Sequence, residues 1–209
     1  MKYKLVAFWL IVFGALFAFL QMCFEYHFYY IEQSQLFLFS EAYIRNKLLL
    51  PGGFSMLVAE FLVQFFIRPY VGALVTAVLL TGVGVCTAGI VKRIAPVSGL
   101  FILYVLPMLA LLFMHFDFNY RVQGTVCYLM MMALLCGYMR IRNDLFRLVA
   151  GCVLVPVLFW LAGSIAVLFA GMVCLFEGLR KTPKWYISLI GVAAVSYTHL
   201  RAHETRGNL

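Results

Sequence analysis

The chain has 209 residues, of which 65% are hydrophobic and only 11% are charged, and its mean hydropathy is +1.00. Soluble globular domains carry about 25% charged residues, so the composition excludes that class and predicts an all-α, polytopic bundle of transmembrane helices. The net charge of +8 does not indicate nucleic-acid binding. The basic residues of the chain are dispersed at the ends of apolar segments, whereas a nucleic-acid-binding protein gathers them on one face or arm.

Four clusters of basic residues separate the apolar segments and predict the topology. Basic residues that flank membrane spans stay on the cytoplasmic side. Placing every cluster inside predicts a cytoplasmic N-terminus and gathers most of the acids on the outer face. The clusters are Lys2/Lys4, Lys92/Arg93, Arg140/Arg142/Arg147 and Arg180/Lys181/Lys184.

Taken in chain order, the apolar segments predict six spans and the start of a seventh. A spanning helix needs about 20 apolar residues. The first segment follows a basic start and lacks a cleavage pattern, so we predict an uncleaved signal anchor. A turn at Ala162-Gly163-Ser164 separates the last two full spans. The predicted spans are residues 5–23, 70–91, 98–114, 122–139, 145–161 and 164–179, with 185–195 as a truncated seventh.

The first outer loop, residues 24–69, is predicted to be ordered and to begin with a short helix. Ser40 can cap this helix, and Glu41 occupies its first turn near the positive end of the helix dipole. The sequence Pro51-Gly52-Gly53 ends it. The loop is therefore more than a flexible connector.

A second short helix is predicted in the same loop, over residues 54–67. Its polar residues Glu60, Gln64 and Arg68 recur at i, i+4 and i+8 and form a narrow stripe on an otherwise apolar helix. That pattern is typical of a helix lying along a membrane interface, with the polar edge toward water or a groove. A short buried span whose polar stripe is satisfied is the alternative.

The C-terminal tail, residues 196–209, looks like the translated read-through of a sequencing adapter, and we predict that it is not native. His199 and His203 stand at i, i+4 and superficially suggest a helical metal site, which this origin makes unimportant. Residues 1–195 are then the N-terminal part of a multi-span membrane domain whose natural chain continues further.

Glu32 is the first candidate for chemistry on the outer face. Neighbouring aromatic residues would partly desolvate its carboxylate, as suits a general base. Gln33 and Gln35 supply neutral hydrogen-bonding groups for a hydroxyl-rich ligand. The alternative is a solvated or helix-capping glutamate.

Asp117 is the second candidate acid, in the short outer loop 115–121. With Glu32 it could hold a divalent cation such as Mg²⁺ or Mn²⁺, although no complete set of metal ligands is visible. Arg121 could grip a phosphate bidentately, and the alternative is a loop ion pair between Asp117 and Arg121. The predicted catalytic residues are Glu32 and Asp117; the predicted substrate-binding residues are Gln33, Gln35, Glu60, Gln64, Arg68 and Arg121.

Two further predictions concern the spans. Glu177, near the inner end of the sixth span, is expected to form a local salt bridge with Arg180 or Lys181. The six cysteines lie inside or at the edges of apolar segments, so no disulfide framework is expected.

The run from Phe28 to Ala73 resembles a family of uncharacterised bacterial polytopic membrane proteins with a domain of unknown function. This resemblance implies a bacterial inner (cytoplasmic) membrane and no established activity. Full members of that family are longer, which agrees with a truncated chain. The motifs that carry it are Tyr29-Tyr30, Glu32-Gln33, Gln35-Leu36-Phe37, Pro51-Gly52-Gly53 and Gln64-Phe65-Phe66.

The layout is also similar to the C-type glycosyltransferases, which use lipid-linked sugars. In that fold the first span leads to a large outer loop with helices beside the membrane, and an acid early in the loop is the catalytic base. A second acid often follows the third span. The resemblance implies these roles for Glu32 and Asp117, but Glu-Gln replaces paired acids here, which puts metal dependence in doubt. It is an analogy of fold.

Two classes of function follow from these observations. The leading hypothesis is an enzyme that transfers a sugar from a polyprenyl-phosphate donor on the periplasmic face. The alternative is a non-enzymatic membrane scaffold or envelope-assembly component, with Phe37, Phe39 and Tyr43 as the docking face. A transporter is less favoured, because no span carries a central charge or an obvious break.

Overall fold

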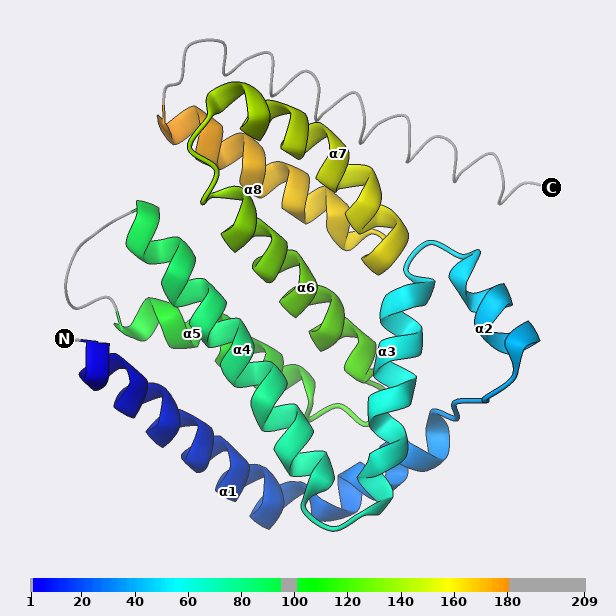
Figure 1. The fold of residues 1–209 in the computed structure, drawn as a ribbon. Coiled ribbons are helices and arrows are strands. Elements are labelled where there is room, and N and C mark those ends of the chain that lie inside the picture. Colours follow the sequence, from blue (N-terminus) through cyan, green and yellow to red (C-terminus); the bar gives the residue numbers. More distant parts are fainter. Residues whose placement is uncertain (1, 95–100, 181–209) are drawn as a thin grey trace.

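The computed structural model describes residues 2–94 and 101–180 (Figure 1). Within these ranges the chain forms eight α-helices and one 3-10 helix and no strand, which confirms the all-α prediction. The elements are α1 (Lys2–Ser34), α2 (Glu41–Leu48), α3 (Gly53–Val63), η1 (Gln64–Ile67), α4 (Val71–Ile94), α5 (Phe101–Met114), α6 (Val122–Tyr138), α7 (Asp144–Ala162) and α8 (Ile165–Arg180).

Three of these helices, α1, α4 and α7, are long and apolar enough to cross a membrane. The chain is therefore a multi-pass membrane protein. The helices α5, α6 and α8 have 14, 17 and 16 residues and are shorter than the usual span, so six spans stay a prediction. The predicted seventh span and the 196–209 tail lie outside the described residues.

The helix α1 continues beyond the predicted end of the first span. Residues 24–34, the first part of the predicted outer loop, continue this helix, which runs unbroken to Ser34. No glycine or proline occurs between residues 15 and 34, so nothing in the backbone ends the helix earlier. Figure 1 shows that the second half of α1 turns away from the direction of the first half.

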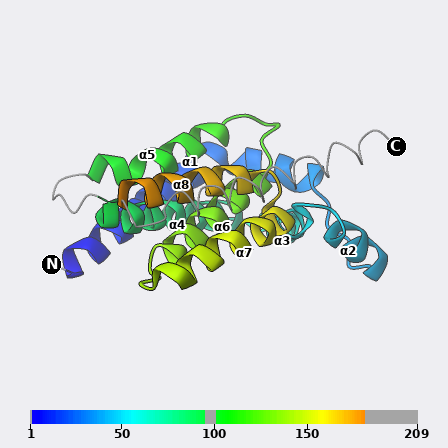
Figure 2. The same ribbon diagram turned by 90° about the horizontal axis from the view of Figure 1, so that it is seen from above.

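The short helix α2 forms where the sequence predicts it. Ser40 is its N-cap, and the Ser40 hydroxyl accepts a hydrogen bond from the Tyr43 backbone N–H at 3.2 Å. The 3-10 turn η1 extends α3 to Ile67, as predicted for the second helix of this loop. Figure 2 shows α2 at the end of the bundle remote from the N-terminus.

The turn between α2 and α3 packs on the turn between α7 and α8. Gly52 and Gly163 both have a positive φ, +77° and +72°, which glycine adopts readily. The Gly52 N–H donates to the Trp160 carbonyl at 2.9 Å, and the Trp160 indole N–H donates to the Leu48 carbonyl at 3.1 Å. These bonds confirm the predicted turn at Gly163 and place it at the same end as the first outer loop.

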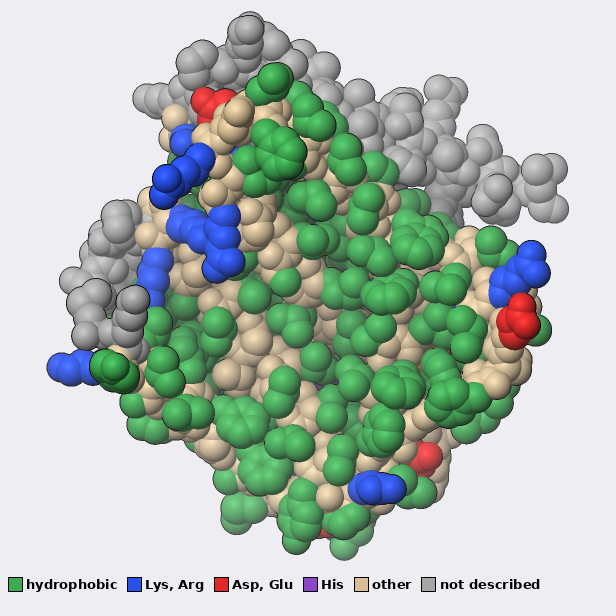
Figure 3. All heavy atoms as spheres, viewed as in Figure 1, with side chains coloured by type: hydrophobic (Ala, Val, Ile, Leu, Met, Phe, Trp, Pro, Cys, Tyr) green, Lys and Arg blue, Asp and Glu red, His purple; other side chains and the backbone are tan. Residues whose placement is uncertain are grey.

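The basic clusters meet at the opposite end of the bundle. Figure 3 shows Lys and Arg side chains gathered where α4, α6 and α8 end. Arg93 from α4 donates to the Cys136 carbonyl of α6 at 2.7 Å, and Arg140, Arg142 and Arg180 line one cavity with Arg93. The described arginines of three of the four clusters therefore come together at one end of the bundle. That this end faces the cytoplasm stays a prediction.

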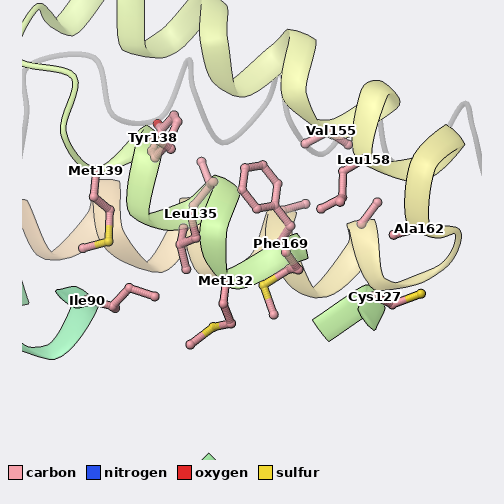
Figure 4. Packing of buried hydrophobic residues seen from close by; sticks show 14 residues of the cluster. Ile90, Cys127, Met132, Leu135, Tyr138, Met139, Val155, Leu158, Ala162 and Phe169 are labelled. Atoms are coloured by element: carbon pink, nitrogen blue, oxygen red, sulfur yellow. The ribbon is translucent and has the colours of Figure 1, made fainter. Parts of the chain in front are cut away.

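The helix α6 lies at the centre of the packing. One face of α6 packs on α7 and α8, where Leu135, Leu158 and Phe169 are fully buried (Figure 4). A second cluster joins α1, α3, α4 and α5 to the other part of α6. The packing of α3 against α6 and α7 brings the polar residues of the first outer loop to the bundle.

Candidate functional site

A cavity of about 220 Å³ lies where α2, α3, the end of α1 and the start of α6 come together. We call it the outer pocket. Its volume is below the 300–1,000 Å³ typical of pockets for drug-sized ligands, so it suits a head group or a single ring. The polar side chains that line it are those of Ser34, Gln35, Tyr43, Lys47, Glu60, Arg121 and Gln123.

Glu60 is the buried acid of the outer pocket. The Lys47 ammonium donates to Glu60 Oε1 at 3.1 Å, and the Tyr43 hydroxyl donates to Glu60 Oε2. Tyr43 and Lys47 stand one turn apart on α2, so capping of this helix by Ser40 aims both donors at the same carboxylate. The Lys47 ammonium also lies 5.3 Å from the centre of the Tyr43 ring.

The Tyr43 hydroxyl stays protonated near neutral pH. Burial, the hydrogen bond to Glu60 and the negative charge of Glu60 together raise the pKa of Tyr43 to about 12. The phenol is therefore a permanent donor to the carboxylate. Both oxygens of Glu60 are occupied, so a ligand hydroxyl that reaches Glu60 must displace one donor or join it.

The charges of the outer pocket sum to one net positive charge. Lys47 and Arg121 are cationic and Glu60 is anionic. Arg121 stands at the N-cap of α6 and its side chain is exposed. In the described chain it pairs with no carboxylate, and the alternative of an ion pair with Asp117 is not observed. A guanidinium in this position can bind a phosphate or a carboxylate of a ligand.

The predicted catalytic acids lie outside the outer pocket. Glu32 is half-buried in the last turn of α1, beside the exposed Gln33. Asp117 is exposed, and its Oδ1 accepts a hydrogen bond from the Asn119 backbone N–H at 2.9 Å. Across residues 2–94 and 101–180 no hydrogen bond joins Glu32 to Asp117, and no group of three or more His, Cys, Asp and Glu residues could hold a metal ion.

The predicted substrate-binding residues separate into two sets. Gln35, Glu60 and Arg121 come together in the outer pocket. Gln64 lies beyond it and donates to the Phe37 carbonyl at 3.2 Å. Arg68 follows η1 and lies in a separate small depression with Glu25.

Sequence reasoning missed Tyr43 and Lys47 as partners of Glu60. Their i, i+4 spacing on the helix predicted after Ser40 shows that they share a face. The sequence contains no signal that this face packs against Glu60, because the pairing depends on how the turn at Gly52 folds α2 back on α3.

A model of a family of unknown function, DUF6057, matches residues 1–203 of the chain. The chain belongs to this family. The match covers far more of the chain than the segment 28–73 that carries the resemblance in the sequence, and it enters the 196–209 tail as far as residue 203. No curated protein and no solved structure matches the chain.

Besides the outer pocket, this DUF6057 chain has a buried polar cluster behind the turn 115–121. His115 is buried, and its Nε2 lies 2.9 Å from Thr125 Oγ1; the Tyr120 hydroxyl lies 3.2 Å from the same oxygen. Burial and the nearby His27 lower the pKa of His115 to about 4. His115 is therefore neutral at pH 7.

Acidification is expected to destabilise this cluster. Between pH 6.5, the ordinary pKa of histidine, and about pH 4, the unfolded chain binds a proton on His115 that the folded protein does not. The free energy of unfolding therefore falls as the pH falls, by about 2 kcal/mol at pH 5. Unfolding in detergent micelles at pH 7 and pH 5 measures this loss. In the variant His115→Gln, the free energy of unfolding should differ less between pH 7 and pH 5. An equal difference in the variant and the unmodified protein would contradict the role of His115.

Proposed function

We propose that the outer pocket binds the phosphate-bearing head group of a polyprenyl-linked sugar on the periplasmic face, within an enzyme of glycosyltransferase-C-like layout. The observation that carries the proposal is the presence of Arg121 and Glu60 in one cavity. A cation for a phosphate and a carboxylate for a hydroxyl are the two groups that such a transfer needs.

The chemistry assigns a role to each side of the outer pocket. Arg121, in the same cavity as Lys47, holds the donor phosphate and stabilises the charge that develops on it. An acceptor hydroxyl oxygen attacks the anomeric carbon of the sugar, the bond from that carbon to the phosphate oxygen breaks, and the polyprenyl phosphate leaves. A carboxylate takes the proton of the hydroxyl.

Two carboxylates compete for the role of base. The similarity of layout to the C-type glycosyltransferases implies this role for Glu32, which stands half a turn before Ser34, a residue that lines the outer pocket. Glu60 lies within the outer pocket itself. Asp117, exposed in the turn before α6, would position the donor or a divalent cation.

Arg121 is expected to carry phosphate binding. Arg121→Gln should weaken binding of a polyprenyl monophosphate to the purified chain in nanodiscs by at least about tenfold, the equivalent of one charge-assisted hydrogen bond. Arg45→Gln is the matched control, because Arg45 is exposed on α2 and carries the same charge without lining the outer pocket. Titration followed by native mass spectrometry measures both. An equal loss in the two variants would contradict the assignment.

Sugar transfer distinguishes the two candidate bases. With the protein in membranes, either Glu32→Gln or Glu60→Gln should abolish transfer while the protein still inserts. Retained transfer in both variants would eliminate the enzymatic proposal.

A scaffold function is the second candidate, and one observation favours it. Exposed apolar side chains surround the outer pocket: Leu36 is 67% exposed and Phe39 is 78% exposed. The Phe37 ring packs edge-on against those of Phe39 and Phe61. If this face docks a partner protein, a photo-crosslinker at Phe39 should capture one protein at constant yield in the Glu60→Gln variant.

A further inference from the structure

We propose that the basic end of the bundle binds one anionic glycerophospholipid, with its head group among four arginines and an acyl chain along the neighbouring groove. This site lies at the end opposite the outer pocket and does not depend on the function proposed there. It would tie the protein to acidic lipids of the leaflet that the basic end faces.

Four arginines from separate elements converge on one cavity of about 620 Å³. Arg93 comes from the last turn of α4, Arg140 and Arg142 from the connection between α6 and α7, and Arg180 from the end of α8. Cationic anchoring at a membrane surface needs only dispersed side chains. Convergence around a cavity is a stronger feature, and basic pockets between transmembrane helices are where acidic lipid head groups bind.

No described carboxylate neutralises these four arginines. The two acids described at this end, Asp144 and Glu177, both bond to Arg147, a different and fully buried arginine. Arg93 donates one N–H to the Cys136 carbonyl at 2.7 Å, which fixes its guanidinium at the cavity wall. Like charges that share one cavity repel, so a phosphate between them would be stabilising.

An apolar groove of about 580 Å³ adjoins the cavity and shares Arg140 with it. The groove lies between α1 and α4, where Leu5, Trp9 and Val85 form part of its walls, and Lys92 stands at the same end as Arg140. An apolar groove with cationic residues at one end matches a phospholipid, whose acyl chain carries a phosphate head group at one end. A free phosphate ion would use the cationic end only, and so the groove favours a lipid.

The experiment compares lipids that differ in head-group charge only. The purified chain is stripped of lipid in a neutral detergent, and its thermal unfolding is followed after addition of phosphatidylglycerol or phosphatidylcholine with identical acyl chains. Phosphatidylglycerol is expected to raise the unfolding temperature, and native mass spectrometry should show one retained molecule per chain. Equal stabilisation by phosphatidylcholine would overturn the proposal.

Matched variants test the location of the site. Arg140→Gln/Arg180→Gln should raise the dissociation constant for phosphatidylglycerol by at least about tenfold. The control Lys4→Gln/Arg45→Gln removes the same charge outside the cavity and should change the constant less than twofold. If the first double variant does not fold, Arg142→Gln, at an exposed loop residue, takes its place with the same expectation. Equal losses in test and control variants would overturn the site.

Two probes test the groove. Val85→Trp should fill the groove and weaken the binding of phosphatidylglycerol, because the Val85 side chain is half-exposed on the wall of the groove. Inorganic phosphate and glycerophosphoglycerol, which lack acyl chains, should not stabilise the protein at the concentrations at which the lipid does. Stabilisation by inorganic phosphate alone, unaffected by Val85→Trp, would identify an anion site without a lipid and overturn the proposal.

Discussion

Replacing Glu177 with leucine is expected to destabilise the protein by about 3 kcal/mol, because it leaves the guanidinium of Arg147 buried without its main counter-charge. Arg147 on α7 is 1% exposed, and its Nε and Nη2 donate to the Glu177 oxygens at 2.5 and 3.2 Å. The Tyr138 hydroxyl of α6 donates to the same carboxylate at 2.9 Å. The variant therefore disconnects three helices at once.

A double variant separates the cost of an unpaired charge from the value of the pair. Arg147→Met/Glu177→Leu removes both charges and should recover most of the loss, ending within about 1 kcal/mol of the unmodified protein. Asp144, the other partner of Arg147, is 58% exposed at its side chain and remains solvated. Unfolding in mixed micelles measures the free energy of unfolding of Glu177→Leu, of Arg147→Met and of the double variant. If the double variant loses as much stability as the two single variants together, Arg147 and Glu177 are not a coupled pair.

Replacing Gly53 with alanine is the second change with a large expected effect. A Cβ at this position would lie 1.7 Å from the carbonyl oxygen of Lys47, and backbone cannot yield as a flexible side chain can. The turn between α2 and α3 must therefore open, which we expect to cost about 3 kcal/mol. Because the clash is with Lys47, the ion pair with Glu60 should be lost with it.

Gly171→Ala on α8 is the matched control, because a Cβ there meets nothing within 4 Å. It should be neutral or slightly stabilising, since alanine favours a helix more than glycine does. Thermal unfolding compares the stabilities, and polyprenyl phosphate binding reports on the outer pocket. Intact stability and binding in Gly53→Ala would contradict the geometry of this turn.

Local signals in the sequence predict most of the helices. Ser40 caps α2 and Gly163 turns the chain between α7 and α8, because each acts through its own backbone neighbourhood. The end of α1 was harder to predict. Glu25 and His27 make the sequence polar after residue 23. Polar residues determine which part of a helix faces water, but they do not break its backbone hydrogen bonds, so α1 continues to Ser34.

The partners of buried charges could not be predicted from the sequence. The Glu60–Lys47 and Glu177–Arg147 pairs join residues 13 and 30 positions apart on different helices. Sequence proximity predicts Arg180 or Lys181 for Glu177, and Lys181 lies outside the described part of the chain. The structure shows Arg147 as a partner of Glu177, because α7 and α8 pack side by side. Such pairing follows from packing, which periodicity alone does not specify.

The candidate site was predicted in part. Gln35, Glu60 and Arg121 were predicted from residue type and the outer-face topology, and the structure brings them into one cavity. The catalytic roles of Glu32 and Asp117 came from a resemblance of layout and stay proposals. Tyr43 and Lys47, the donors that orient Glu60, depend on a turn whose direction the sequence does not reveal.

Both proposed sites require that the outer pocket and the basic end lie on opposite sides of the membrane. In a background whose six cysteines are replaced by alanine, single cysteines at Ser34 and Asn119 report the outer pocket side, and one at Arg142 reports the basic end. An impermeant thiol reagent added to intact cells should label positions 34 and 119 and leave 142 unlabelled until lysis. Labelling of 142 in intact cells, or protection of 34 or 119 until lysis, would contradict the account.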